Sequence, residues 1–368
     1  MLNNKSLVKP SLTHIITLLL FCIIWTCPFG CAPTNRQAAT SEAGVSGQEN
    51  TQAQLVEVRN IWDKAPHNAF TDLIRYKGKW FCAFREGQTH SSTDGKLRII
   101  TSRDGRKWKS AALITSKTED LRDAKLSIRP DGKLMLIAAA AVRKEKHTEF
   151  QTRAWLSSDG RKWSDGIDIG EKNVWLWRIA WHKGIAYGVG YDALAGGDNH
   201  GFVRLYKSKD GIHYETVIDK LYEKGYPSEA ALLFDANDTA YCLLRRDDPN
   251  LGYRSVWGVS QPPYTDWTWN ELIWSTCSPA MMEIPGVGIV AASRSWRPGI
   301  ESCTALWRIE PKTGELTTLL IFPSRGDTSY PGLVWHDGLL WVSYYSAHEG
   351  TYWQDCAIYM AKVKFPCK

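Results

Sequence analysis

The sequence lacks the cysteine and histidine patterns that usually hold a metal ion. Its nine cysteines and nine histidines are scattered, and none of them forms a CxxC pair or an HExxH motif. We therefore expect no catalytic metal and no cofactor. The spacing of the cysteines beyond residue 31 leaves any disulfide pairing open. These cysteines are Cys82, Cys242, Cys277, Cys303, Cys356 and Cys367.

The chain also lacks a strong charge of either sign and any long apolar run. Its 368 residues carry a formal net charge of +6, which is too mild for a nucleic-acid binder. The apolar run over residues 15–27 is shorter than the roughly 18 residues that a membrane-spanning helix needs. The 43% hydrophobic content is enough for an ordinary globular core, which excludes intrinsic disorder and a coiled coil.

The N-terminal segment predicts export. Lys5 and Lys9 precede the apolar run, and the sequence Pro-Phe-Gly-Cys ending at Cys31 follows it. Cys31 behind a small residue resembles the bacterial lipobox, which implies a lipid-anchored protein of the cell envelope. We expect a lipoprotein-type signal peptide over residues 1–31 and a flexible tether over residues 32–54, which contain no aromatic residue. Ordinary cleavage and a periplasmic or secreted protein is the alternative.

An internal repeat organises the rest of the chain. Six segments each combine an extended apolar stretch, a short turn with Gly or Asn-Asp, and a second β-rich stretch. Aligned on one apolar position, the copies recur every 50–53 residues. The aligned positions are Leu73, Leu126, Ile179, Leu232, Met282 and Leu333. This regular spacing predicts six copies of one β unit.

A second motif follows three of the hairpins. Residues Ser102–Trp108, Ser157–Trp163 and Ser208–Tyr214 share the pattern Ser-x-Asp-Gly-x-x-aromatic. In such a turn the Ser and Asp side chains accept hydrogen bonds from backbone amides, and Gly allows a positive φ. The aromatic residue packs back on the sheet. The predicted role of the motif is therefore structural.

Together, the two repeats predict an all-β protein with one architecture. Six units of four strands give a six-bladed β-propeller over residues 55–368, with about 52 residues per blade. We expect the strand at residues 55–62 to complete the last blade and close the ring. The result is one domain without internal boundaries, which we expect to be a monomer.

Ser-x-Asp-Gly turns on a six-bladed propeller resemble the Asp boxes of the sialidase (neuraminidase) superfamily, and the resemblance covers the whole mature chain. Ser228-Glu229 followed by Arg245 resembles the sialidase glutamate and its downstream arginine. Ser329-Tyr330-Pro-Gly-Leu resembles the stretch that holds the sialidase nucleophile. The resemblance implies that Tyr330 is the nucleophile and that Glu229 is its base.

The chemistry of an acidic sugar explains these residue types. A carboxylate on the anomeric carbon would repel a carboxylate nucleophile, whereas a neutral tyrosine meets no such charge. Arginines would hold the substrate carboxylate, and a carboxylic acid would protonate the leaving oxygen. In sialidases that acid lies in a loop of the first blade, here residues 88–95. The matching candidate is Asp94, and Asp72 is the next.

The repeat register brings further charged residues to the same edge of the propeller, around one open end of its central axis. We call this open end the mouth. Arg85, Arg245 and Arg294 occupy equivalent positions at the ends of three hairpins, which predicts an anion site. The Arg-Ile-Pro motif of sialidases is missing from the first blade, so we expect Arg85 to substitute for its arginine. Arg297 is the alternative to Arg294 as the last arginine that holds the substrate carboxylate. The other expected substrate-binding residues are Asp72, Arg122, Asp123, Trp177 and Arg178.

These features predict an exo-acting glycoside hydrolase that removes a terminal acidic sugar from a glycan. The sugar is sialic acid or a related 2-keto-3-deoxy sugar acid, and a chain-end uronate also fits the altered anion site. One alternative is a polysaccharide lyase in which Tyr330 or His67 abstracts the proton α to a uronate carboxylate. Another is a surface glycan-binding propeller. Glu229 and Tyr330 favour an enzyme, because binding alone needs neither.

Overall fold

The computed structural model describes residues 53–366, apart from residue 146, residues 298–299 and residues 351–353. The side chains of residues 296, 297 and 300 are outside the description as well. The chain divides into two compact units, Met1–Glu49 and Asn50–Lys368, and every described residue belongs to the second. The signal peptide, nearly all of the tether and the lipidation of Cys31 fall outside the described residues and stay predictions.

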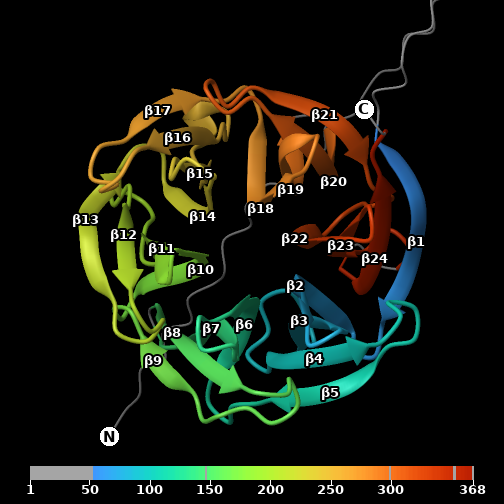
Figure 1. Ribbon diagram of the computed structural model, residues 1–368. Helices are drawn as coiled ribbons and strands as arrows, with labels where there is room; N and C mark the ends of the chain where they lie inside the picture. Colours follow the sequence, from blue (N-terminus) through green and yellow to red (C-terminus); the bar gives the residue numbers. More distant parts are fainter. Residues whose placement is uncertain (1–52, 146, 298–299, 351–353, 367–368) are drawn as a thin grey trace, which may run out of the picture. The chain divides into compact units, whose positions relative to one another are not determined.

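The described chain forms six four-stranded antiparallel sheets, arranged as blades around a central axis (Figure 1). This confirms the predicted six-bladed propeller. Each predicted hairpin forms the first two strands of a blade, and the first strand lies nearest the axis (Figure 1). Neighbouring blades cover both faces of these strands, which explains their continuous apolar sequences. In β7 (Leu134–Arg143), for example, all residues except the last two are buried.

The first three blades follow one another along the chain, each running from the axis outward. Blade 1 consists of β2 (His67–Tyr76), β3 (Lys79–Gly87), β4 (Lys96–Ser102) and β5 (Lys109–Ile114). Blade 2 consists of β6 (Asp120–Ile128), β7, β8 (Thr148–Ser157) and β9 (Ile167–Ile169). Blade 3 consists of β10 (Val174–His182), β11 (Ile185–Asp192), β12 (Val203–Ser208) and β13 (Glu215–Tyr222).

Blades 4 to 6 repeat the pattern, with one short 3₁₀ helix, η1 (Pro249–Leu251), after the second strand of blade 4. Blade 4 consists of β14 (Pro227–Phe234), β15 (Ala240–Arg246), β16 (Val256–Ser260) and β17 (Thr268–Glu271). Blade 5 consists of β18 (Ser275–Ile284), β19 (Gly288–Arg297), β20 (Ile300–Ile309) and β21 (Leu316–Ile321). Blade 6 consists of β22 (Thr328–His336), β23 (Leu339–Ser346), β24 (Ala357–Lys364) and β1 (Gln54–Trp62).

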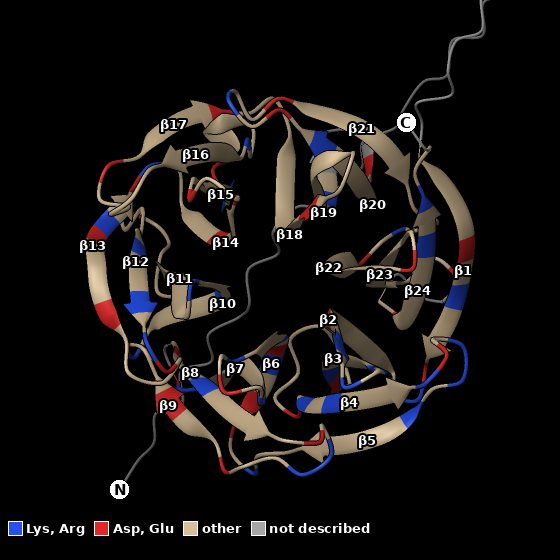
Figure 2. Cartoon of the chain, in the orientation of Figure 1, with Lys and Arg blue, Asp and Glu red and all other residues tan. Residues whose placement is uncertain are grey.

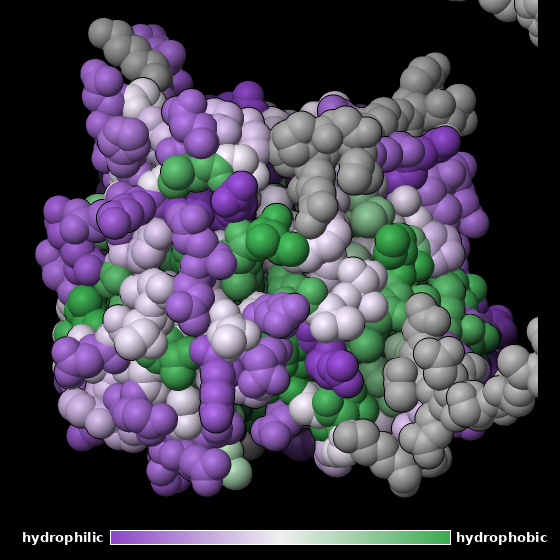
Figure 3. Space-filling view, turned by 90° about the horizontal axis from the view of Figure 1, so that it is seen from above, coloured by the Kyte–Doolittle hydropathy of each residue, from purple (hydrophilic) through white to green (hydrophobic). Residues whose placement is uncertain are grey.

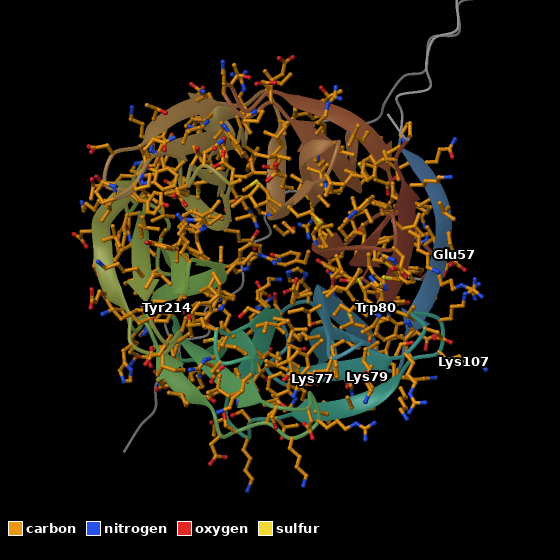
Figure 4. The ribbon with its side chains drawn as sticks, in the orientation of Figure 1. Glu57, Lys77, Lys79, Trp80, Lys107 and Tyr214 are labelled. Atoms are coloured by element: carbon orange, nitrogen blue, oxygen red, sulfur yellow. The ribbon has the colours of Figure 1, made fainter. Side chains whose placement is uncertain are left out.

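Blade 6 closes the ring by joining the two ends of the described chain. β1 pairs antiparallel with β24, from Gln54 opposite Lys364 to Trp62 opposite Ile358. On this seam the Lys362 ammonium lies 2.8 Å from the Glu57 carboxylate, and Figure 4 labels Glu57 on β1 at the outside of the ring. The predicted closure is confirmed, with β1 beginning at Gln54, one residue earlier than predicted.

The apolar core is divided into six clusters. Five of them lie between two adjacent blades, and the sixth joins blades 1 and 6 to residues of blades 2 and 3. Between blades 1 and 6, for example, Trp80 and Trp341 pack with ring centroids 4.3 Å apart. Much of the tryptophan-rich composition is used in this way, since Trp80, Trp177, Trp257 and Trp307 are fully buried. Blade-to-blade packing therefore carries the apolar stabilisation of the ring.

The Ser-x-Asp-Gly turns attach each of the first three blades to its neighbour. In the first turn Asp104 accepts hydrogen bonds from the amides of residues 106 and 107, and the Ser102 hydroxyl accepts from the amide of Gly105. Gly105 has a φ of 69°, and a Cβ there would collide with the Trp341 ring of blade 6. The other two turns repeat these hydrogen bonds. Figure 4 labels Lys107 of the first turn and Tyr214 of the third.

Among the innermost strands, charged residues gather on β6, and elsewhere they lie mostly on the outer strands and loops (Figure 2). Seen from the side, the ring exposes hydrophilic groups with smaller hydrophobic groups between them (Figure 3). Within the described part of the chain, five cysteines are free thiols: Cys82, Cys242, Cys277, Cys303 and Cys356. No helix among the described residues is long and apolar enough to cross a membrane.

The closure of the ring predicts how truncations behave. A chain that begins at Asp63 lacks β1, so β24 becomes an unpaired edge and blade 6 loses a quarter of its strands. We expect a melting temperature at least about 10 °C lower, measured by circular dichroism. A chain that begins at Ala53 keeps β1 and is the matched control. Equal melting of the two chains would contradict a structural role for the closing strand.

Candidate active site

Every innermost strand carries a register shift at the same point, which turns side chains toward the mouth of the propeller. In four of the six blades a residue within this bulge has a positive φ. These residues are Phe70 (63°), Asp123 (60°), Ser278 (53°) and Tyr330 (50°). Such conformations are costly for residues with a side chain and cluster at functional sites. The bulges therefore mark the mouth as the candidate site.

A buried hydrogen bond joins the two residues that the sequence resemblance singles out. The Tyr330 hydroxyl donates to Glu229 Oε1 at 2.5 Å, from β22 to β14 across the ring. Tyr330 is 7% exposed and Glu229 is 4% exposed. The fold thus brings together two residues that lie 101 positions apart in the sequence.

Electrostatics assign the shared proton to Tyr330. Burial alone would raise the pKa of Glu229, but Arg245, the Tyr330 hydroxyl and Arg294 together hold it below its usual value. Burial raises the pKa of Tyr330 well above its usual value, and the nearby Glu229 and Asp123 charges raise it further. Glu229 is therefore an ionised acceptor beside a neutral phenol, as a general base and a nucleophile require.

The second oxygen of Glu229 is held in place by two donors. Arg245 Nη1 donates to Oε2 at 2.8 Å, and the backbone amide of Ser278 donates to the same oxygen at 2.8 Å. The Ser278 hydroxyl also accepts a hydrogen bond from the Tyr330 amide at 3.3 Å. The bulge of blade 5 therefore positions both partners of the Tyr330–Glu229 pair.

Aromatic rings and cations surround the Tyr330 ring. Its centroid lies 4.8 Å from that of Phe70 and 5.9 Å from that of Tyr345. Lys125 Nζ is 5.4 Å from the ring centroid and the Arg294 guanidinium is 5.8 Å from it. Cations at these distances favour negative charge on the phenol oxygen, and so assist loss of its proton.

Lys125 is a member of the site that the sequence analysis missed. It is 2% exposed on β6, donates to the carbonyl of Thr71 at 3.2 Å, and lies 4.9 Å from the Trp177 ring centroid. Burial lowers its pKa to about 8, with the nearby Arg178 charge acting in the same direction. Its signal in the sequence was weak, because the same strand also carries Asp120, Arg122 and Asp123, so one more charged residue does not stand out.

The structure brings Arg245 and Arg294 to the mouth, but both are paired with protein carboxylates. Arg245 Nε donates to Asp247 at 2.7 Å in addition to its contact with Glu229. Arg294 lies 3.5 Å from Asp327 and donates to the Tyr345 hydroxyl at 3.0 Å. Each guanidinium is about one-fifth exposed, so each can also contact a ligand.

The residues predicted before the second and third hairpins form two further ion pairs. Arg122 lies 3.8 Å from Asp123 and 5.0 Å from the Phe70 ring centroid, and its Nε has no hydrogen-bond partner among the described residues. Asp123 accepts a hydrogen bond from the Trp177 indole at 3.1 Å. Burial raises the pKa of Asp123 above its usual value, although Arg122 and Lys125 oppose the shift.

Asp72 and Arg178 form the second of these pairs and support the wall of the mouth. Arg178 Nη1 lies 3.2 Å from Asp72 Oδ1, and its Nη2 donates to the carbonyl of Pro331, directly after Tyr330. Asp72 Oδ2 accepts from the amide of Leu126 at 2.7 Å. Asp72 is 2% exposed and both of its oxygens are engaged within the protein. Its role as the next candidate acid stays a prediction.

Arg85 also has a different position from the predicted one. It is fully buried, and its guanidinium donates to Asp120 at 2.7 Å and to the carbonyls of Thr89 and Ser92. These contacts hold the loop after β3 against blade 2. With its donors engaged inside the protein, Arg85 does not substitute for the missing arginine of the Arg-Ile-Pro motif. Arg297 ends β19, and its side chain lies outside the described residues.

The loop over residues 88–95 presents a different residue from the one predicted. Asp94 accepts a hydrogen bond from the amide of Gln88, within the same loop. Burial works to raise its pKa, but the Ser92 hydroxyl and the Gln88 amide hold it below its usual value. A carboxyl group that ionises so readily is poorly suited to donate a proton. His90 of this loop instead contacts Phe70, with ring centroids 5.0 Å apart.

Asp327 is a further buried carboxylate of the site, and the sequence analysis missed it. Its Oδ2 contacts His67 Nε2 at 2.9 Å and His90 Nδ1 at 2.6 Å, while its Oδ1 accepts from the Tyr345 hydroxyl at 2.6 Å. Burial opposes its ionisation, but the two histidines and Arg294 hold its pKa far below the usual value. The repeat gives no sign of Asp327, because it precedes β22 in a loop.

One group of side chains among the described residues could hold a metal ion: His67, His90 and Asp327. Each offers one ligand atom, and these ligand atoms all lie within 4.8 Å of one another. Asp327 already accepts a hydrogen bond from the Tyr345 hydroxyl, and the Arg294 guanidinium lies beside it. Protein groups therefore already balance the charge of this carboxylate. His67 is fully buried. It therefore does not reach a substrate, and Tyr330 is left as the base in the lyase alternative.

Solved structures with the same fold were found by comparison. A protein of unknown function from Dyadobacter fermentans has a TM-score of 0.72 at 15% identity, over 86% of this chain and all of its own. A Penicillium chrysogenum α-L-arabinanase complexed with arabinobiose has a TM-score of 0.63 at 15% identity, over 85% of this chain and 98% of its own. No protein-family model and no curated protein matches the sequence.

Trypanosoma rangeli sialidase in complex with the inhibitor DANA has a TM-score of 0.62 at 13% identity. The match covers 81% of this chain and 55% of that protein, so this chain spans about half of its length. The structural neighbours thus include propeller glycosidases with different substrates. At these identities the likeness establishes the fold.

The buried charge of Glu229 predicts how the site responds to loss of a partner. Arg245→Met leaves this carboxylate without its nearest cation, which typically costs about 3–5 kcal/mol of unfolding free energy. The double variant Arg245→Met/Glu229→Gln removes the charge as well and should recover much of that loss. Urea unfolding measures both, and two additive losses would contradict the coupling. Arg204→Met, on the outer part of blade 3, is the matched control.

Proposed function

We propose that the protein is an exo-acting glycoside hydrolase in which Tyr330 is the nucleophile and Glu229 is its base. The observation that carries the proposal is the 2.5 Å hydrogen bond from a neutral, buried phenol to an ionised carboxylate. A phenol has a reference pKa near 10, so it attacks at neutral pH only when a nearby base takes its proton. Neither residue is needed for binding alone.

The reaction then has two displacements at the anomeric carbon. In the first, the Tyr330 oxygen bonds to that carbon, its proton moves to Glu229, and the bond to the leaving group breaks as an acid protonates the leaving oxygen. In the second, water attacks the same carbon and gives a proton to the conjugate base of that acid, the bond to Tyr330 breaks, and Glu229 returns the proton to the phenol oxygen. Two inversions predict retention of the anomeric configuration.

The substrate favoured by this site is a terminal sugar acid, such as sialic acid or a related 2-keto-3-deoxy sugar acid. A tyrosine nucleophile avoids the repulsion that a carboxylate nucleophile would meet at an anomeric carbon bearing a carboxylate. Arg245 and Arg294 are partly exposed beside the Tyr330–Glu229 pair. Next to Arg245, a cavity of about 380 Å³ lined by Tyr191, Tyr226, Ser228 and Asp247 provides room for part of the glycan.

A neutral terminal sugar is the second candidate, because the arginines at the mouth are already paired. Arg122, Arg178, Arg245 and Arg294 each lie within 4 Å of a protein carboxylate. Less positive charge is then free for an anion than in a cluster of unpaired arginines. The arabinose-processing neighbour of the same fold suggests a pentofuranoside as the neutral sugar to test.

A panel of aryl glycosides tests the proposal and its substrate class. We expect release of the aryl group from a sialoside or a 3-deoxy-2-ketoside, with retention observed by proton NMR. We also expect a methyl ester of the same sugar to be cleaved at least about 10-fold less efficiently, since an arginine fork binds a carboxylate more strongly than an ester. Cleavage of an arabinofuranoside alone would instead favour the neutral sugar. An unsaturated product from a uronate would establish a lyase, and no turnover of any substrate would leave a glycan-binding protein.

A double-mutant cycle tests whether Tyr330 and Glu229 act as one unit. Tyr330→Phe removes the nucleophilic oxygen, and Glu229→Gln removes the base while keeping its shape. Each should lower kcat by several orders of magnitude on the best substrate of the panel, and the double variant should be little worse, because such groups are strongly non-additive. Small and additive losses would mean that the two residues only line a binding pocket. Circular dichroism checks that all three variants are folded.

A further inference from the structure

We propose that His90, oriented by Asp327, is the general acid and base of the reaction, in place of a carboxylic acid. This inference rests on the proposed hydrolase function and adds a catalytic residue to it. It starts from the loop over residues 88–95, which contacts Phe70 in the bulge of β2. Within that loop, His90 contacts the mouth through Phe70, whereas Asp94 is hydrogen bonded to its own loop.

The position of His90 is suited to a leaving group at the mouth. Its ring and the Tyr330 ring both contact the Phe70 ring, with centroids 5.0 Å and 4.8 Å from the phenyl centroid. The His90 side chain is 35% exposed, whereas Tyr330 is 7% exposed, so His90 is the more accessible of the two to solvent. A sugar bound over Tyr330 would therefore place its glycosidic oxygen toward the solvent side, where His90 lies.

Asp327 determines which nitrogen of His90 can exchange a proton. Because the Asp327 carboxylate is ionised, the His90 Nδ1 that lies 2.6 Å from it must carry a proton and donate. His90 Nε2 has no hydrogen-bond partner among the described residues. It is then the nitrogen free to give or accept a proton, as in other catalytic histidines held by a carboxylate.

The surroundings of Asp327 keep it in this role. The neutral, buried His67 donates from Nε2 to the same carboxylate oxygen, and Tyr345 donates to the other. The Arg122 guanidinium donates to the His90 carbonyl at 3.2 Å, which fixes the loop above the mouth. The proposal makes positioning residues of Asp327, His67 and Arg122. Of these four residues, His90 is the one that contacts the substrate.

The proton balance of both steps closes through His90. In the first displacement, protonated Nε2 gives its proton to the glycosidic oxygen as the bond to the anomeric carbon breaks, and the leaving group departs as an alcohol. In the second, Nε2 takes a proton from the attacking water while the bond to Tyr330 breaks. Each turnover consumes one water and returns His90 to its protonated form.

Leaving-group dependence provides the decisive test. His90→Ala should lower kcat/KM by about 10²–10⁴-fold on a sugar-linked substrate with a poor leaving group. On a dinitrophenyl glycoside, whose leaving oxygen needs no proton, the first step should be nearly unchanged. Azide, which attacks without a base, should accelerate turnover of this substrate and yield a glycosyl azide. The matched control is His213→Asn, which lies in the Ser208–Tyr214 turn of blade 3, away from the mouth. It should behave like the wild type.

Each other outcome overturns the assignment in a recognisable way. Equal losses on both substrates would make His90 a structural residue. The same leaving-group pattern in Asp94→Asn or Asp123→Asn would transfer the role to that carboxyl group. Loss of wild-type activity with a chelator, restored by a divalent cation, would make His67, His90 and Asp327 a metal site. No wild-type turnover on any substrate would be a failure of the proposed function itself, which separates it from a failure of His90.

Discussion

The ionised carboxylate of Glu229, buried in the mouth of the propeller, is the constraint around which the site is arranged. A charge removed from water needs donors on every accepting atom, because an unpaired buried charge costs several kcal/mol. The donors come from three blades: the Tyr330 hydroxyl, the Arg245 guanidinium and the Ser278 amide. The relative positions of blades 4, 5 and 6 are therefore coupled to the protonation state of the site.

The same demand explains the strained inner strands. A regular strand would direct alternate side chains into the packed space between blades, where Tyr330 and Asp123 could not meet a substrate. The bulges turn these residues toward the axis at the cost of positive φ angles. Six apolar clusters between the blades supply the stability that maintains this strain.

Another buried carboxylate, Asp327, is the centre of a second network, which reaches Tyr330 through Tyr345. Tyr345 contacts Asp327 and also packs near Tyr330, so the two networks share an aromatic wall. Arg294 contributes charge to both, because it lies beside Asp327 and lowers the pKa of Glu229. A mutation in either network is therefore expected to change the charge and packing of the other.

The sequence by itself determined the architecture, because the 50–53 residue repeat and its turn chemistry are local signals. The aligned positions of the repeat placed Glu229 and Tyr330 at equivalent points of two blades, and the structure joins them by a hydrogen bond. Only the tertiary structure decided the roles of the other polar residues. Arg85 and Asp94 share the expected loop region, yet their contacts there bind the loop to itself and to blade 2. Lys125, His90 and Asp327 join the site through contacts between blades, and a pattern within one repeat carries no record of such contacts.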